Sequence, residues 1–227
     1  MKINQIKNKG LCFLLFFLLQ ANAEINCDKQ FIIIQKPIIF DSERTFLTQQ
    51  YRKQHYGIEK QSISIIPEMI VLHWTEINNF EESFKTFYPT ILRGRKDIAA
   101  ASKLNVSAHY LVDRDGSIYQ LMPDNWMGRH VIGLNTIAIG IENVGGANNI
   151  ENLTEQQVAA DSYLVCILKQ KYPSIKYLIG HYEYLQFRHT PLWLEKDPNY
   201  FTSKTDPGKK FMVQVRAHVK DFFIRPQ

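Results

Sequence analysis

A strand, a long helix and a second strand follow one another in residues 136–181, and this order constrains the fold more than any other feature. TIAIGIENV and KYLIGH are apolar runs of strand length. Between them, LTEQQVAADSYLVCILKQKYP predicts a helix, because Thr154 and Gln157 form a capping-box pattern at its start and Pro173 marks its end. This order is typical of a sheet that carries helices on its faces.

The other segments fit the same architecture. SISIIPEMIVLHWT predicts a strand that ends at His73, and HYLVDRDGSIYQLM predicts a hairpin around Asp115-Gly116. Asp41 is a helix-capping residue type and Gly57 a helix-ending one. These two residues predict a helix in residues 41–57. Further helical structure is expected in part of residues 81–103 and in about 209–223. We predict the α/β class, with a single domain whose central mixed β-sheet is flanked by helices.

The front of the chain predicts export. Three lysines and no acid stand in the first ten residues, the apolar run LCFLLFFLLQ follows, and Ala21-Asn22-Ala23 forms a small-x-small cleavage signal. This pattern is typical of a secretory signal peptide at 1–23, and an uncleaved anchor is the alternative. The run is short for a bilayer span. We expect an extension at 24–64, a catalytic domain at 65–227, no stable membrane span after cleavage, and a periplasmic or secreted protein.

The net charge argues against nucleic acid as a partner, and the two cysteines leave two possibilities open. Cleavage after Ala23 would remove three of the 27 basic residues and none of the 22 acids, leaving a net charge of +2. That charge is too small to indicate nucleic-acid binding, and we expect a monomer. Cys27 and Cys166 would remain. They could pair in an oxidising compartment, or Cys166 could be a buried free thiol.

Three residues are candidate metal ligands. A catalytic zinc site needs three protein ligands and one open position. His73 and His181 end predicted strands, and Asp206 lies in the turn KTDPG. Strand ends hold ligands rigidly, although each histidine alone is better explained as an ordinary core or supporting residue. The combination of two strand-end histidines with a turn-held aspartate favours a zinc site more than either histidine does, but spacings this long are not specific to a metal site.

Glu142 and Lys204 are candidate catalytic residues. In IAIGIEN, one strand face carries three isoleucines, and the other carries Ala138, Gly140 and Glu142. The small residues beside a single acid suggest room for a substrate and a general base, with a solvent-facing glutamate as the alternative. Lys204 stands two residues before Asp206, where it either forms a surface ion pair or stabilises negative charge.

Five motifs in register resemble one family. VLHWT, SAHYLVDRDGSIYQLM, AIGIENVG, LIGHYEY and KTDPGKKF occur in the order seen in the zinc-dependent N-acetylmuramoyl-L-alanine amidases of the amidase-2 family. This family shares its fold with the peptidoglycan recognition proteins and phage T7-type lysozyme. The resemblance covers residues 65–223.

The resemblance implies a role for each matching residue. His73, His181 and Asp206 match the zinc ligands, Glu142 the catalytic glutamate, and Lys204 the basic residue near the third ligand. The implied reaction cuts the amide between N-acetylmuramic acid and L-alanine in peptidoglycan or muropeptides. A non-catalytic peptidoglycan-binding module and a zinc hydrolase of ordinary peptides are the alternatives.

Two motif positions distinguish this chain from some branches of the family. Some relatives use a tyrosine where this chain has Ala108, so the resemblance places more weight on Glu142. Relatives with an aspartate as third ligand, like Asp206 here, form the bacterial branch, whereas the recognition proteins and the phage enzyme place a cysteine there.

Substrate contacts are expected around the segment NWMGRHVIGLN. Many relatives have Trp-His-Ala-Gly there, whereas this chain keeps Trp126 and has its histidine later, at His130. Arg129 and His130 either line the cleft or form a packed corner. His189, in the loop before the third ligand, contributes to a cleft wall or only to loop packing. His109 reads as a core residue or a support for a ligand.

Overall fold

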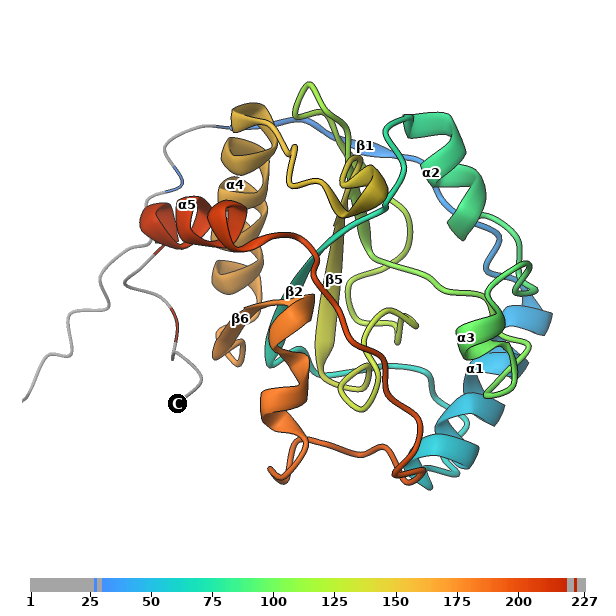
Figure 1. Ribbon diagram of the computed structural model, residues 1–227. Helices are drawn as coiled ribbons and strands as arrows, with labels where there is room; N and C mark the ends of the chain where they lie inside the picture. Colours follow the sequence, from blue (N-terminus) through green and yellow to red (C-terminus); the bar gives the residue numbers. More distant parts are fainter. Residues whose placement is uncertain (1–26, 28–29, 220–222, 224–227) are drawn as a thin grey trace, which may run out of the picture.

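A six-stranded mixed sheet forms the centre of the molecule (Figure 1). The computed structural model describes residues 27, 30–219 and 223, so the predicted signal peptide lies outside the described residues. The sheet order is β1-β4-β3-β5-β2-β6. β3 and β4 run antiparallel and the other neighbouring strands are parallel. The strands are β1 (Ile33–Gln35), β2 (Met69–Trp74), β3 (Tyr110–Val112), β4 (Ile118–Gln120), β5 (Ala138–Asn143) and β6 (Tyr177–Gly180).

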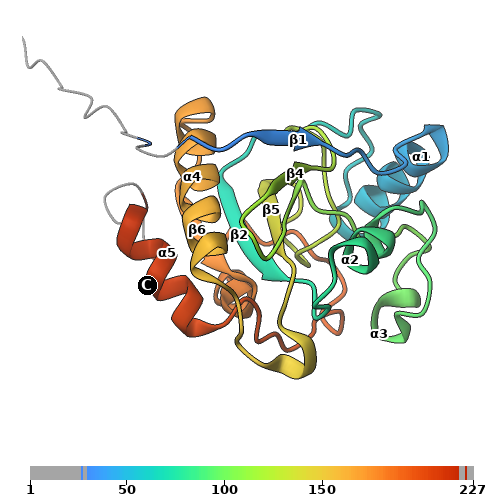
Figure 2. The ribbon, with the colours of Figure 1, turned by 90° about the horizontal axis from the view of Figure 1, so that it is seen from above.

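Helices cover both faces of this sheet. Viewed from above, α4 and α5 lie on one side, and α1, α2 and α3 lie on the other (Figure 2). The helices are α1 (Ser42–Tyr51), α2 (Phe80–Phe87), α3 (Lys96–Ala99), α4 (Glu155–Lys171) and α5 (Lys209–Val219). A π-helical turn (Arg52–Tyr56) extends α1, and 3-10 turns occupy Ala147–Asn149 and His181–Phe187. The predicted single α/β domain with a mixed sheet is confirmed.

The predicted start and stop signals act as expected. The side chain of Asp41 accepts a hydrogen bond from the backbone N–H of Arg44, and Gly57 ends the π-helical turn with a left-handed backbone. Thr154 and Gln157 form a reciprocal capping box at α4. These side chains satisfy backbone donors that the first turn of a helix leaves unpaired. Across the described part of the chain, no helix combines the length and apolar character that crossing a bilayer requires.

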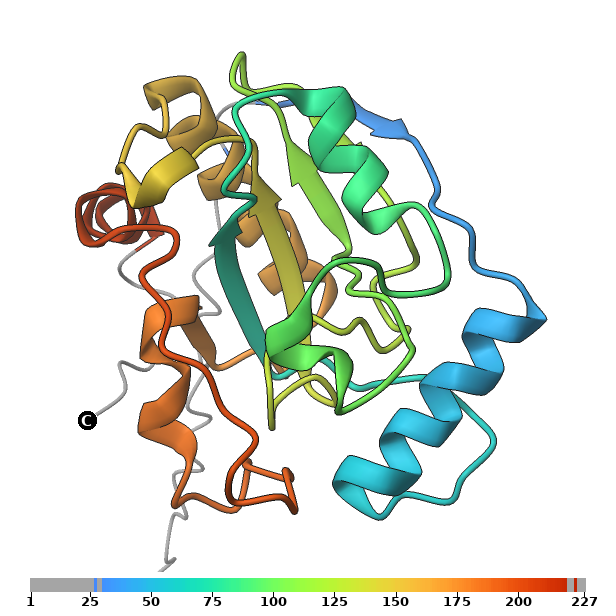
Figure 3. The same cartoon turned by 45° about the vertical axis from the view of Figure 1, so that its right-hand side comes forward.

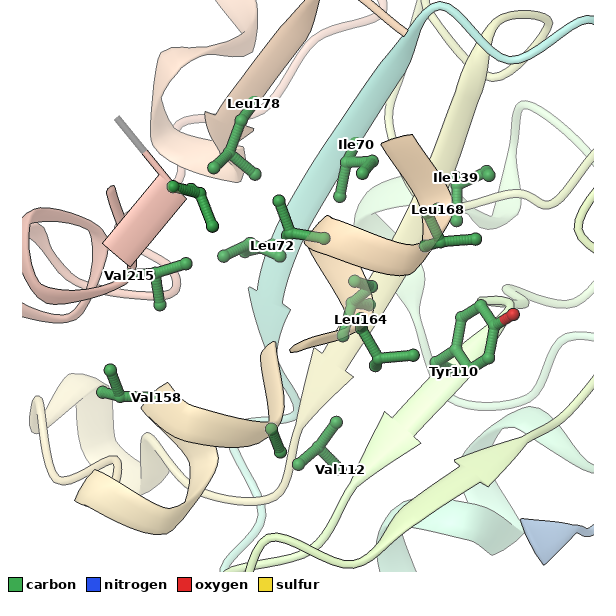
Figure 4. Close-up of a cluster of buried hydrophobic side chains, with 14 of the residues drawn as sticks. Ile70, Leu72, Tyr110, Val112, Ile139, Val158, Leu164, Leu168, Leu178 and Val215 are labelled. Carbon is green, nitrogen blue, oxygen red and sulfur yellow. The ribbon is translucent and has the colours of Figure 1, made fainter. Parts of the chain in front are cut away.

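The alternation of side chains along β2 divides the core between the two sheet faces. Ile70 and Leu72 pack with Leu164 of α4 and Val215 of α5 (Figure 4). Met69 and Val71 point to the opposite face, into a second apolar cluster that includes Tyr51, Ile98 and Leu134. Because side chains alternate along a strand, His73 points to this second face, away from α4.

Several contacts attach the segment before β2 to the domain, among them a disulfide, a strand pairing and a buried arginine. Cys27 forms a disulfide with Cys166 on α4, which settles the two alternatives for that cysteine. β1 pairs in parallel with β4 at the edge of the sheet. Arg44 of α1 is fully buried, and its guanidinium donates to backbone carbonyls of residues 87–89 at the end of α2.

Asp161 is a buried carboxyl group on α4, on the face of the sheet opposite to His73. It is fully buried on α4, and its Oδ2 accepts a hydrogen bond from Asn143 Nδ2 at 2.9 Å. Asn143 Nδ2 also donates to the carbonyl of His73 at 3.2 Å. Asp161 Oδ1 has no hydrogen-bond partner among the described residues. Burial raises the pKa of Asp161 to about 8, because it disfavours the charged form.

Replacing Asp161 with asparagine should therefore flatten the dependence of stability on pH. Between pH 3.8 and about 8, the folded protein holds a proton that the unfolded chain has released, so stability falls as the pH rises. The amide cannot ionise. We expect the melting temperature of Asp161→Asn, relative to that of the wild type, to be roughly 4 °C or more higher near pH 9 than near pH 5. Thermal unfolding at both pH values checks this; parallel pH profiles for the two proteins would contradict it.

Candidate metal centre

Three neighbouring parallel strands bring the first site residues together. β5, β2 and β6 lie side by side, and His73 is the register partner of Glu142 across β2 and β5. His181 directly follows the last residue of β6. Figure 3 shows β2 and β5 pointing the same way, with α3 and the segment before α5 on their near side. Ligands commonly bind at such carboxyl ends of parallel strands.

Asp206 reaches this edge from the turn before α5. The backbone N–H of Tyr182 donates to the carbonyl of Asp206 at 3.0 Å, which ties the turn to the residue after His181. The turn closes through Gly208, whose N–H donates to the carbonyl of Thr205 and whose φ is 93°. A side chain is strained at that φ, so glycine suits the position.

The donor atoms of His73, His181 and Asp206 form a small triangle. His73 Nδ1 lies 3.0 Å from His181 Nδ1 and 3.2 Å from Asp206 Oδ2, and His181 Nδ1 lies 3.0 Å from the same oxygen. Neighbouring ligands around a tetrahedral zinc ion with bonds of ~2.0–2.1 Å are separated by about 3.3 Å. All three side chains are buried. Two imidazoles and one carboxylate at these separations fit a zinc ion that keeps a fourth position free.

The electrostatics of the triangle favour metal-binding protonation states. Burial, together with the nearby His181, lowers the pKa of His73 to about 4. Burial alone would raise the pKa of Asp206, but His181 and His73 hold it well below its usual range. A neutral imidazole and an ionised carboxylate are the forms that bind a metal ion.

Glu142 is buried at the edge of the triangle, and its Oε2 has no hydrogen-bond partner among the described residues. Burial and the Asp206 carboxylate raise the pKa of Glu142 well above its usual range, while the charges of Lys204 and Arg95 oppose the rise. Lys204 is half-buried and lines the same cavity as Glu142. A buried carboxylate oxygen without a partner is costly, and Asp161 has one as well. Glu142 differs from Asp161 because it lines the cavity that the three side chains of the triangle also line, which favours a chemical role for Glu142.

A cavity of about 350 Å³ is lined by all five of the predicted metal-binding and catalytic residues: His73, Glu142, His181, Lys204 and Asp206. Tyr51 of α1, Trp74 of β2, Arg95 and Ile98 also line it. The contribution of Tyr51 had no signal in the sequence, because α1 precedes the motifs and meets the cavity only through folding. The site therefore draws on the segment before β2 as well as on the sheet.

Two of the four predicted substrate contacts line this cavity, and two do not. Arg129 and His130 line it, whereas Trp126 and His189 are not among its lining residues within the described chain. The guanidinium of Arg129 donates to three backbone carbonyls between residues 98 and 104. Trp126 packs against Phe40 with ring centroids 4.8 Å apart, and the side chain of His189 is exposed.

The small residues beside Glu142 have a different purpose from the one that the sequence suggested. The space next to Gly140 holds the imidazole of His130, and a Cβ at Gly140 would lie 2.7 Å from His130 Nδ1. The interpretation that this space receives substrate is therefore wrong. A glycine inside a strand is a signal of close approach by another group, but the sequence did not identify which group approaches.

The comparisons with known proteins agree with this geometry. The family model for N-acetylmuramoyl-L-alanine amidase, Amidase_2, matches residues 47–209. Among curated proteins, the endolysin of Enterobacteria phage K11 is 30% identical over 82 residues, which are 34% of this chain and 54% of that protein. The chain thus spans about half the length of this relative.

Two solved structures share the fold. N-acetylmuramoyl-L-alanine amidase LysC from Clostridium intestinale URNW is 20% identical with a TM-score of 0.52, over 84% of this chain and 99% of that one. PGRP-SA from bumblebee is 18% identical with a TM-score of 0.51, over 87% and 100% of the two chains. Because the family model covers most of the sequence, the chain belongs to the Amidase_2 family of N-acetylmuramoyl-L-alanine amidases.

Proposed function

We propose that the protein hydrolyses the amide between N-acetylmuramic acid and L-alanine in peptidoglycan or muropeptides, with zinc as cofactor. The family supports the bond type. The observation that carries the proposal is the buried, unpartnered Oε2 of Glu142, within the described chain, beside a complete set of zinc-ligating side chains. A ligand set alone would fit a structural metal, whereas an adjacent free carboxylate supplies a general base.

His73, His181 and Asp206 would hold the ion at the strand ends. When bound, zinc would polarise the scissile carbonyl, help to activate water, and add a positive charge that counteracts the raised pKa of Glu142. Glu142 takes a proton from the attacking water at its carboxylate and returns it to the nitrogen of the departing L-alanine. The Nζ of Lys204 stabilises the negative charge that develops on the former carbonyl oxygen.

The main alternative from another class is a recognition module that binds muropeptides without cutting them. Such a module has no need of a complete ligand set or a general base. Here the three ligand side chains and Glu142 are all present in one cavity, which favours the enzyme. A zinc hydrolase of ordinary peptides is the second alternative, because the fold alone does not fix the substrate.

Digestion of purified peptidoglycan and of soluble muropeptides tests the proposal. We expect mass spectrometry to find free stem peptides that begin with L-alanine, together with glycan that has lost its peptides. A chelator should stop the release and added zinc should restore it. Casein should remain intact in the same assay. Binding without release would favour the recognition module, and cleavage of casein would favour the peptide hydrolase.

We also infer that the protein acts outside the cytoplasm, where peptidoglycan lies. The disulfide between Cys27 and Cys166 and the signal-like first 23 residues support this, since disulfides persist in oxidising compartments. Cell fractionation that recovered the full-length chain in the cytoplasm, with both thiols reduced, would contradict it.

A further inference from the structure

His130 lies directly behind the metal ligand His73. His73 uses Nδ1 toward the ligand triangle, and its other ring nitrogen, Nε2, lies 3.0 Å from His130 Nδ1. The rings meet edge to face, with an interplanar angle of 88°. The second nitrogen of His130, Nε2, lies 3.2 Å from the backbone carbonyl of Ala138 on β5. Both nitrogens of His130 are therefore engaged inside the protein.

The carbonyl of Ala138 sets the direction of both hydrogen bonds in the series from His73 through His130 to Ala138. A carbonyl only accepts, so His130 Nε2 donates to Ala138, and the Nδ1 of a neutral His130 is an acceptor. His73 must then donate from Nε2, which leaves the lone pair of Nδ1 facing His181 and Asp206. The opposite direction would place a proton on His73 Nδ1, where it would block a metal ion.

The imidazole of His130 lies in a space that two glycines leave open. A Cβ at Gly140 would lie 2.7 Å from His130 Nδ1, and one at Gly128 would lie 3.1 Å from His130 Cδ2. The backbone N–H of His130 donates to Asn135 Oδ1 at 2.9 Å. The two glycines thus leave room for the ring against β5, and the Asn135 amide holds the backbone that carries it. Such an arrangement suits a group with one required orientation.

We infer that His130 is a positioning residue, which holds His73 in the tautomer and ring orientation that metal binding requires. The inference rests on the metal site of the proposed function, and it assigns His130 to the metal rather than to the substrate. Groups that support metal ligands in this way fix the tautomer and raise the basicity of the ligand.

The affinity for zinc is the direct test. In a competition titration against a chromophoric chelator, we expect His130→Leu to bind zinc about 10–100-fold more weakly than the wild type. Leucine keeps an apolar group beside Gly140 but removes the acceptor. His130→Asn keeps a carbonyl oxygen near the position of Nδ1, and should recover affinity to within about threefold of the wild type.

His109 offers a matched control. It is a fully buried histidine whose ring lies 5.8 Å from that of His130, but its nitrogens bind the carbonyl of Trp126 and the N–H of Gly140. His109→Leu should lower the melting temperature and leave zinc affinity unchanged. Equal losses of zinc affinity in the leucine variants at 109 and 130 would assign both effects to general damage and overturn the inference.

Nuclear magnetic resonance of the metal-free wild type tests the inference without any variant. Two-bond proton–nitrogen spectra should show His73 with its proton on Nε2. A proton on Nδ1, or a His130→Leu variant that binds zinc as tightly as the wild type, would overturn the inference. These readouts need no substrate. A wild type that binds zinc but releases no stem peptide would overturn only the proposed reaction.

Discussion

Asp206→Ala is expected to purify without zinc, whereas the wild type should carry close to one zinc ion per chain. The change removes the anionic member of the ligand triangle and leaves two imidazole nitrogens 3.0 Å apart. Two neutral ligands are too few for a stable protein-bound zinc, which takes at least three protein ligands in catalytic sites. Elemental analysis after gel filtration measures the content, and stem-peptide release should be lost with the metal.

Asp124→Asn is a suitable control for this loss. Asp124 is another buried carboxylate, but it accepts hydrogen bonds from Tyr110 and Lys171. It belongs to the region between β4 and the end of α4, not to the ligand triangle. This variant should keep its zinc even where its melting temperature falls. One zinc ion per chain in Asp206→Ala would remove Asp206 from the ligand set.

Glu142→Gln should separate metal binding from turnover. The amide fills the same space, so the zinc content should equal that of the wild type. It cannot take a proton from water, and loss of a general base typically lowers kcat by about 100–10,000-fold. Rates of stem-peptide release from a defined muropeptide, measured beside elemental analysis, check both expectations. A variant that keeps the wild-type rate would exclude Glu142 as the base.

Lys204→Met gives the matched comparison in the same assay. It removes the ammonium group but keeps most of the side-chain stem, and the loss of one group that stabilises an oxyanion typically costs about 100–1,000-fold in kcat. Lys176→Met changes a lysine at the start of the β6 region that pairs with Glu68, and its rate should be unchanged. Equal rates for the two methionine variants would contradict the role of Lys204.

Local signals in the sequence predicted the framework well. The caps at Asp41 and at Thr154, and the turn at Asp115-Gly116, depend on residues within a few positions of one another. The strand-end positions of His73 and His181 follow from the same local patterns. Their convergence with Asp206 did not follow from these local patterns, because such long spacings are not specific; the resemblance to the amidase-2 family implied it, and the structure brings the three ligand atoms within 4.8 Å of one another.

Contacts between distant residues could not be predicted in this way. His73 and His130 are 57 positions apart, and nothing in either neighbourhood reports that they meet. The same limit applied to the disulfide, whose cysteines are separated by 139 positions, and to Tyr51 in the cavity wall. The division at residues 64 and 65, the substrate contacts and the monomeric state stay predictions.

The bond between Cys27 and Cys166 also fixes the place on the domain from which anything ahead of Cys27 would start. Cys166 belongs to α4, which covers the face of the sheet turned away from His73. Any tether, tag or neighbouring module ahead of Cys27 would consequently start at the rear of the enzyme. A bulky, cross-linked polymer could then press against the catalytic side while the protein stays attached by its back.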